Sequence, residues 1–416
     1  MITTINNKHN KLNFSNEREQ SQTCLNSAEH EKNQGRKVLN VPNLRFPEFE
    51  GEWEKSKLSD LCTFFSGGTP SSSNKDFYGG NIAFIRSGEL HADSTELFIT
   101  QAGFDSSSAK MVEVGDLLLA MYGATSGDIA VSKIKGAINQ AILCIRTKQN
   151  KKFIESVWNK HVSKNLRKYL QGGQGNLSAD IVKGISFFFP TLKEQEKIAN
   201  LVSLLDERIA TQNKIIEDLK KLKCAIIEKV YSEIQGQEYL YGQLFDVVNE
   251  RNKQMEYSNI LSASQEKGMV NRDDLNLDIQ FERSNINNYK IVKKGDYVIH
   301  LRSFQGGFAF SDKLGVCSPA YTILRPNSIL EYGYLSNYFT SQRSIKSLVL
   351  VTYGIRDGRS INVDEWLRMK ITIPPKEHQQ YIVKVIGIFE RKIEDEEAYA
   401  AQLSIQKQYL LRQMFV

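Results

Sequence analysis

The 416-residue sequence lacks the motifs by which most enzymes that use nucleotides or metals are recognised. It has no GxxxxGK[ST] phosphate loop, no HExxH motif and no glycine-rich turn for S-adenosylmethionine, and its six histidines are isolated. Pro374 and Pro375 follow Ile373, whereas amino-methyltransferases place Asn or Asp before Pro-Pro to hold the target amine. Paired carboxylates with a lysine, as a metal-dependent nuclease would need, are also missing. We therefore expect no catalytic residue, no metal site and no bound cofactor in this chain.

Long apolar runs and paired cysteines are missing as well. No stretch approaches the ~18 apolar residues of a membrane span, and no signal peptide is visible. The five cysteines are scattered without a CxxC pair, which favours reduced thiols over a disulfide framework or a zinc site. These absences predict a cytoplasmic protein with no membrane partner.

A long helix is the strongest signal that the sequence does contain. Residues 193–234 include neither Pro nor Gly, and Pro190 prevents the helix from extending further back. A helix of about forty residues would be roughly 60 Å long. Its apolar residues follow the steps of four and three that are typical of a coiled-coil seam; they are Ile198, Val202, Leu205, Ile209, Ile216, Leu219 and Ile226. An apolar stripe this narrow requires a partner helix.

The partner helix lies in the same chain, because the seam recurs 184 residues later. The same offset relates Pro190 to Pro374 and Gln195 to Gln379, and it holds without a gap from Leu177 to Tyr231. This match indicates a tandem duplication in which each copy is a globular segment followed by a long helix. The second seam consists of Ile382, Ile386, Phe389, Ile393, Leu403 and Leu410.

Two polar positions interrupt each seam, Gln212 and Lys223 in the first helix and Glu396 and Lys407 in the second. Buried polar residues fix the register of many coiled coils, so these residues could align the helices; the alternative is that they are tolerated at the edge of the seam. If the second helix packs back along the first, the helices are antiparallel. We then expect a pseudo-two-fold axis, with the globular units at opposite ends.

Composition divides the chain into five segments. Residues 1–40, rich in Asn, Gln, Glu and Lys, are predicted to be a flexible tail. Residues 41–189 form a first domain, 190–235 the first helix, 236–373 a second domain and 374–416 the second helix. Both helices carry equal numbers of acidic and basic residues, so the net charge of +6 lies in the tail and domains, where it suits phosphate contact.

Short strand candidates predict an α+β fold with a mainly antiparallel sheet in each domain. Segments such as 114–123 and 141–147 are bounded by Gly, Asp or Ser, and residues 153–170 have a helical pattern. Gly115-Asp116 and Gly295-Asp296 are interpreted as structural turns. The predicted fold is therefore two duplicated domains separated by two long helices that form an antiparallel coiled coil with pseudo-two-fold symmetry.

The entry to each long helix resembles the specificity (S) subunits of type I restriction-modification systems. Their pattern P-x-x-x-E-Q-x-x-I is present here as Pro190, Glu194, Gln195 and Ile198, whereas in the second copy His378 replaces the glutamate. The opening LRFPEFEGEWE, the loop SGGTPS and the order globular–helix–globular–helix are also similar to that family. The resemblance covers about residues 41–416.

The resemblance implies a non-catalytic reader of double-stranded DNA. Each globular segment would be a target recognition domain that reads one half of a split, asymmetric sequence, and the helices would set the unread spacer. Two methylation (M) subunits would dock on the chain, and restriction (R) subunits would join them. The complex would be a site-specific endonuclease and adenine-N6 DNA methyltransferase that uses S-adenosylmethionine, ATP and Mg through those partners.

Candidate DNA contacts are polar and cationic residues on loops that could enter a groove. For any single residue the alternative is an ordinary solvated surface position, but two loops occupy corresponding places in both copies (121–127 with 301–307, and 171–176 with 355–360). In the first domain the candidates are Gly68, Thr69, Ser71, Lys75, Arg86, Tyr122, Thr125, Ser126, Lys133, Gln174 and Asn176. In the second they are Arg302, Ser303, Gln305, Lys313, Tyr353, Arg356 and Arg359.

Two other classes of function remain as alternatives. A duplicated protein-interaction scaffold with a coiled-coil spacer would have the same architecture, and DNA binding with and without a methylation subunit would distinguish it. A self-contained enzyme would need the motifs that are missing, and binding of S-adenosylmethionine by the isolated chain would support it.

Overall fold

The computed structural model describes residues 40–169, 177–264, 267–274, 283–300, 307–353 and 360–416. The chain divides into unit 1, Met1–Asp206 with Ile405–Val416, and unit 2, Glu207–Ser404. The division passes through both long helices, so each unit contains one globular domain and parts of both helices. The predicted tail, except for Asn40, lies outside the described residues.

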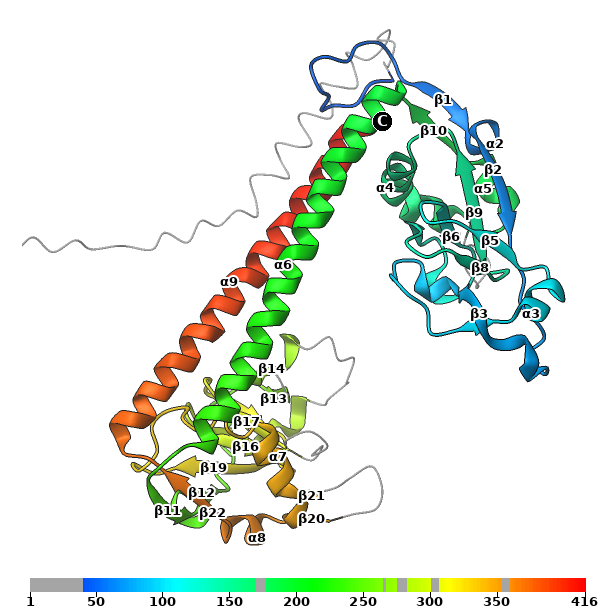
Figure 1. Ribbon diagram of the computed structural model, residues 1–416. Coiled ribbons are helices and arrows are strands. Elements are labelled where there is room, and N and C mark those ends of the chain that lie inside the picture. The colour runs from blue at the N-terminus through cyan, green and yellow to red at the C-terminus, as the bar shows by residue number, and fades with distance from the viewer. Residues whose placement is uncertain (1–39, 170–176, 265–266, 275–282, 301–306, 354–359) are drawn as a thin grey trace, which may run out of the picture. The chain divides into compact units, whose positions relative to one another are not determined.

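Unit 1 is built on two four-stranded sheets and one strand pair (Figure 1). The first sheet has the antiparallel order β2-β9-β6-β7, with β2 at Cys62–Ser66, β9 at Ile142–Thr147, β6 at Leu117–Ala120 and β7 at Ile129–Val131. The second has the order β4-β3-β8-β5, with β4 at Phe98–Ile99, β3 at Tyr78–Ile85, β8 at Gly136–Ile138 and β5 at Lys110–Val112. In it β3 and β8 are parallel. The pair joins β1 (Glu54–Lys57) to β10 (Ser186–Phe189). The domain's helices are α2 (Leu58–Leu61), α3 (Gln101–Asp105), α4 (Lys151–Tyr169) and α5 (Ala179–Gly184).

Unit 2 repeats the antiparallel four-stranded sheet and the terminal strand pair of unit 1. Its four-stranded antiparallel sheet has the order β12-β19-β16-β17, with β12 at Phe245–Val248, β19 at Thr322–Pro326, β16 at Tyr297–Ile299 and β17 at Phe308–Phe310. The pair β11 (Gln237–Leu240) with β22 (Lys370–Ile373) corresponds to β1 with β10. The other pairs are β13 (Leu261–Ser264) with β14 (Gly268–Asn271), β15 (Lys290–Val292) with β18 (Gly315–Cys317), and β20 (Thr352–Tyr353) with β21 (Ser360–Ile361). The domain's helices are α7 (Gln342–Leu348) and α8 (Val363–Leu367). The predicted α+β, mainly antiparallel fold is confirmed in both copies.

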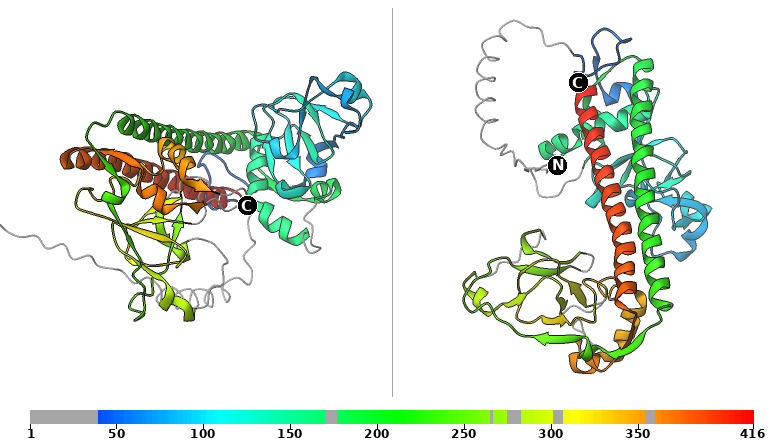
Figure 2. Two further views of the ribbon diagram at one scale, coloured as in Figure 1. Left: turned by 90° about the horizontal axis from the view of Figure 1, so that it is seen from below. Right: turned by 90° about the vertical axis from the view of Figure 1, so that its left-hand side faces the viewer.

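The two long helices are α6 (Leu192–Ser232) and α9 (Lys376–Met414), which lie within the predicted ranges 190–235 and 374–416. They lie side by side and antiparallel in each unit (Figures 1 and 2). In unit 2, Lys223 of α6 pairs with Glu390 of α9, and Gln212 bonds to Glu396. Along the helix pair the residue numbers rise on one helix as they fall on the other, so the helices are antiparallel. No helix in the described part of the chain is long and apolar enough to cross a membrane.

The predicted seam positions fall into two groups. At the end of α6, Ile226 is half-buried, whereas its neighbour Ile227 is buried because it packs into the core of the second domain. The buried positions are Ile198, Val202, Ile216, Ile382, Ile386, Ile393 and Leu403. The half-buried ones are Leu205, Ile209, Leu219, Ile226, Phe389 and Leu410.

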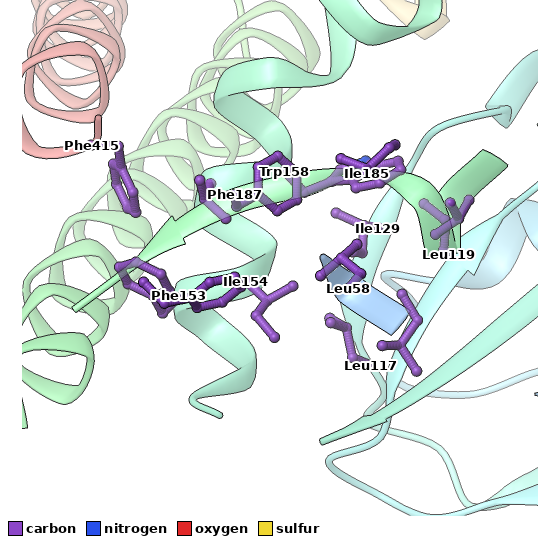
Figure 3. Close-up of a cluster of buried hydrophobic side chains, with 14 of the residues drawn as sticks. Leu58, Leu117, Leu119, Ile129, Phe153, Ile154, Trp158, Ile185, Phe187 and Phe415 are labelled. Atoms are coloured by element: carbon purple, nitrogen blue, oxygen red, sulfur yellow. The ribbon is translucent and has the colours of Figure 1, made fainter. Parts of the chain in front are cut away.

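The core of unit 1 collects side chains from distant parts of the sequence. Trp158 and Phe153 of α4 pack with Phe187 of β10, and Phe415, just beyond α9, lies in the same cluster (Figure 3). The ring centroids of Phe153 and Phe415 are 5.2 Å apart. In unit 2 the aromatic Tyr231, near the end of α6, packs in the corresponding way on its own domain. Each domain is thus anchored to the end of a long helix.

Candidate nucleic-acid interface

The turn at residues 121–127 is firmly attached to the core of unit 1. The Met121 N–H donates to the Ala141 carbonyl at 2.8 Å, and the Met121 carbonyl accepts from the Leu177 N–H at 2.9 Å. At the other end of the turn, Trp158 Nε1 donates to the Gly127 carbonyl at 2.8 Å. Gly127 has a φ of +90°, a conformation that glycine adopts without strain. The turn is therefore a rigid support for the side chains that it presents.

Three of the predicted DNA contacts lie on this turn. The ring of Tyr122 is 39% exposed, while Thr125 and Ser126 are half-buried. Ser126 Oγ donates to the Met121 carbonyl at 3.0 Å, which stabilises the turn from inside. Tyr122 is thus the most accessible of the three.

Two neighbouring segments meet the turn. Thr69 Oγ1 donates to Gln140 Oε1 at 2.5 Å, and Gln140 directly precedes Ala141, which bonds to Met121. Leu177, bonded to the same Met121, follows the segment that contains Gln174 and Asn176; those two residues lie outside the described part of the chain. Thr69 and the turn are therefore close together, as expected for residues of one surface.

The segment after β3 is tied to the same turn. His91 Nε2 lies 2.9 Å from Asp128 Oδ1, next to the turn, and Lys133 Nζ lies 2.7 Å from Asp93 Oδ1. Arg86 is at the start of this segment, where its Nη2 lies 2.8 Å from Glu89 Oε1. This hydrogen bond raises the pKa of Arg86, and it holds the guanidinium in place while leaving the side chain 52% exposed.

The remaining predicted contacts of unit 1 are on the loop 66–75. One of them, Gly68, needs correction: it is buried, and a Cβ atom there would lie 2.1 Å from Ser108 Oγ. Gly68 therefore serves close packing of the loop and has no surface to offer to DNA. Ser71 is exposed and bonds to Ser73, whereas the exposed Lys75 side chain has no partner within the described segments.

In unit 2 the structure describes only the frame of the corresponding surface. The His300 N–H donates to the Gly307 carbonyl at 2.9 Å, which closes the counterpart of the turn 121–127. Lys313 is half-buried, and Tyr353 lies on β20. The predicted contacts that lie outside the described residues are Arg302, Ser303, Gln305, Arg356 and Arg359.

An ion pair between a buried aspartate and a more exposed arginine supports the sheet in each copy. Asp116 lies 2.8 Å from Arg146 Nη2 and accepts the Glu113 N–H at 3.0 Å. Asp296 lies 2.9 Å from Arg325 Nη2 in the same way. The preceding glycines have φ angles of +90° and +93°. The interpretation of both Gly-Asp pairs as structural turns is confirmed.

Two side chains at this surface are not among the sequence-based candidates. Gln140 bonds to Thr69, and His91 bonds to Asp128. Their residue types suit hydrogen bonding to bases or phosphates. Nothing in the sequence pattern distinguishes them from other polar residues in loops, because their place depends on contacts far apart in the chain.

Comparison with known proteins identifies two matching segments. Residues 50–221 and 237–404 each match the family described as "Type I restriction modification DNA specificity domain". The two matches together cover most of the chain and coincide with the two copies of the repeat.

Curated relatives and a solved structure agree with this family. The type I restriction enzyme MjaIX specificity subunit of Methanocaldococcus jannaschii is 24% identical over an alignment of 209 residues that covers 47% of this chain and 48% of the relative. The EcoR124I/EcoR124II specificity subunit of Escherichia coli is 28% identical over 189 residues, 43% and 46% of the two chains. The chain thus spans about half the length of the curated relatives it matches. The S subunit from M. genitalium has the same fold, with a TM-score of 0.54, 14% identity and coverage of 90% of this chain and 99% of that one.

Proposed function

The chain belongs to the type I restriction-modification DNA specificity family and carries two copies of its domain, and from this we propose that it is the non-catalytic subunit that selects the DNA sequence. In this proposal each recognition domain reads one half of a bipartite, asymmetric site. The observation that carries it is the contrast between the two copies. The strand order of the four-stranded antiparallel sheet is the same, but the sequences at corresponding places differ, with GATSG at 123–127 and SFQGG at 303–307.

The arrangement of the first surface supports base reading by unit 1. Tyr122, Thr69 and Arg86 lie on segments that hydrogen bonds tie to one rigid turn. Side chains held in this way can discriminate bases at a small entropic cost. The exposed Lys75 side chain is suited to a phosphate, which would position the domain on the duplex.

The long helices support the role of a spacer. In each unit α6 and α9 are antiparallel, as expected if the two domains are to face the two halves of a split site. The unread spacer between the halves would then follow from the helix length.

Apolar side chains on the outer faces of these helices support docking of partner subunits. Surfaces of this kind commonly mark protein interfaces. In the proposed complex two methylation subunits bind here, and restriction subunits join through them; S-adenosylmethionine, ATP and Mg would be used by those partners. The exposed residues are Leu204, Ile215, Leu222, Tyr381, Ile388, Ile405 and Tyr409.

Methylation mapping tests this function directly. DNA from cells that express the methylation subunit of the same system is compared with and without this chain. A bipartite motif with N6-methyladenine should be present only with the chain. If the motif is unchanged without it, or if the purified chain with the methylation subunit binds proteins but no specific duplex, the scaffold function is favoured instead.

A further inference from the structure

Polar contacts join α6 to α9 at several levels, and three of them involve the polar residues that interrupt the seam. In unit 2 the Gln212 side chain donates to the Glu396 carboxylate. Also in unit 2, Lys223 Nζ lies 2.7 Å from Glu390 Oε1. In unit 1 the ammonium group of Lys407 pairs with Asp206. All of these contacts join one helix to the other.

The internal repeat relates these contacts to one another. Adding 184 converts Asp206 into Glu390 and Lys223 into Lys407, so the ion pair of unit 1 is the ion pair of unit 2 with the two repeats exchanged. Gln212 contacts Glu396, which is its own counterpart. A residue that meets its own repeat lies on the local two-fold axis of the helix pair. These three contacts therefore obey the symmetry of the duplication, whereas the exposed contacts Lys220–Glu397 and Arg208–Tyr399 do not.

At the ends of the helix pair, apolar side chains such as Phe415 and Ile227 pack in the domain cores, but midway between those cores the apolar seam does not specify this alignment. The buried apolar cluster between the helices is small and consists of Ile216, Ile393 and Ala400. If α9 moved by one heptad, Ile386 or Ala400 would lie opposite Ile216 in place of Ile393. Each of these residues is apolar, so the seam would remain apolar after the shift.

The polar residues do discriminate against the shift. Moving α9 by one heptad would place Phe389 or Leu403 opposite Gln212, which is only 6% exposed. A shift of α9 in either direction would also separate Asp206 from Lys407. A buried polar group without a partner is costly, so such alignments are disfavoured. In a parallel pair, Asp206 would approach Glu390 and Lys223 would approach Lys407, which adds repulsion between like charges.

We propose that these polar contacts determine DNA specificity by fixing the axial alignment of α6 with α9, and thereby the spacer length that the protein accepts. The inference rests on the proposed function, in which the helices set the spacer. A shift of one heptad is about 10 Å, or about three base pairs at ~3.4 Å each. Small errors in alignment therefore correspond to a different spacer.

The test uses the full-length chain assembled with its methylation subunit. Binding is measured on duplexes that carry both half-sites of the mapped motif, with spacers up to three base pairs shorter or longer. In the double variant Gln212→Leu with Glu396→Leu, apolar contacts replace the central polar one and keep the helices packed. The preference for the native spacer over its neighbours should fall from about tenfold or more to about threefold or less.

Reversing the charges of the ion pair between Lys223 and Glu390 provides the second part of the test. Lys223→Glu, which then faces Glu390, should broaden the accepted spacers, and adding Glu390→Lys should restore the native preference. Lys221→Glu is the matched control, because Lys221 is exposed and pairs with Glu217 of its own helix; the preference should not change. An unchanged preference in both the apolar variant and Lys223→Glu, at native helicity, would overturn the proposal and leave the proposed function standing. Absence of specific binding by the unsubstituted chain on every spacer would contradict both.

Discussion

At the residue scale, Glu194 shows how one buried side chain joins separate segments of the chain. The carboxylate is 1% exposed and accepts hydrogen bonds from Arg45 Nε and Nη2, both at 2.8 Å, and from Trp53 Nε1 at 3.3 Å. The second copy has His378, which is exposed, at this position. There α6 leads into β11 within a few residues, so no segment supplies an arginine, and a buried glutamate would be left without a partner.

Replacing this carboxylate should destabilise unit 1. Glu194→Ala leaves the Arg45 guanidinium, which is 16% exposed, without its partner. Breaking a buried pair in this way costs about 3–5 kcal/mol, and the partial exposure of Arg45 reduces this to about 2–3 kcal/mol. Urea unfolding followed by tryptophan fluorescence measures the loss, because Trp53 is next to the substitution. His378→Ala, the same position in the second copy, should change stability by less than ~0.5 kcal/mol. Equal losses in the two variants would show that the contact with Arg45 is not the cause.

Asp116 should make the stability of unit 1 depend on pH. Burial acts to raise the pKa of Asp116, but hydrogen bonds from Arg146 and from the Glu113 N–H outweigh it and hold the pKa below its usual value. In the unfolded chain an aspartate titrates near ~3.9. The stabilisation is therefore complete above that pH and is lost as the pH falls through the lowered pKa of the folded state.

The measurement is the unfolding free energy of the unsubstituted chain minus that of Asp116→Asn, from about pH 6 down to about pH 3. The difference should be largest at the upper end and shrink in acid. A difference that stays constant across this range would show that the charge of Asp116 does not stabilise the fold.

At the element scale, the long helices could be predicted from the sequence because their apolar pattern repeats many times. Periodicity alone could not show which part of the protein the ends of the helices pack against. Ile227, and not Ile226, is buried, because near its end α6 packs on the core of the second domain as well as on α9. The heptad pattern describes helix against helix, and it fails where a helix meets a sheet.

Loop residues of the candidate interface were harder to predict for a related reason. The sequence gives the type of a residue but not which side of a loop is open to solvent. Gly68 has its open side filled by Ser108, and Arg86 is held by Glu89. Gln140 was missed because its bond to Thr69 joins segments some seventy residues apart. Contacts of this kind arise only when the sheet is assembled.

The anchoring of the chain's last residues to the first domain can be tested with Phe415. Its ring is buried and lies 5.2 Å from that of Phe153 and 6.4 Å from that of Trp53, centroid to centroid. Phe415→Ala leaves a cavity, and such changes cost about 3–5 kcal/mol. The loss should appear in the unfolding of unit 1, again followed by tryptophan fluorescence. Ile405→Ala on the same helix is the control; Ile405 is 67% exposed, so its loss should be below ~0.5 kcal/mol. If Ile405→Ala lowers the free energy of unfolding by as much as Phe415→Ala, the core of unit 1 does not depend on Phe415.

At the scale of the whole molecule, the duplication preserved what lies inside and changed what lies outside. Gln195 and Gln379 make matching bonds at the start of α6 and α9: each donates to a proline carbonyl five residues earlier in the helix entry, at 2.9 Å. The order of the four-stranded sheet and its Asp–Arg pair are also the same in both copies. The corresponding segments 121–127 and 301–307 share little sequence. Two domains with one frame and different surfaces are expected to act independently.

Exchange of one domain tests that independence. A chimaera in which residues 236–373 come from a relative should change one half of the methylated motif and leave the other half and the spacer unaltered. The graft must retain Tyr334 and Tyr338, because both rings pack on Tyr231 of α6 and their loss would detach the helix from the domain. Methylation mapping provides the measurement, and the reciprocal exchange of residues 54–189 is the control, which should change the opposite half. Since α6 and α9 are kept in both chimaeras, a change in both halves after a single exchange would mean that the domains read the DNA jointly, and the modular interpretation would be wrong.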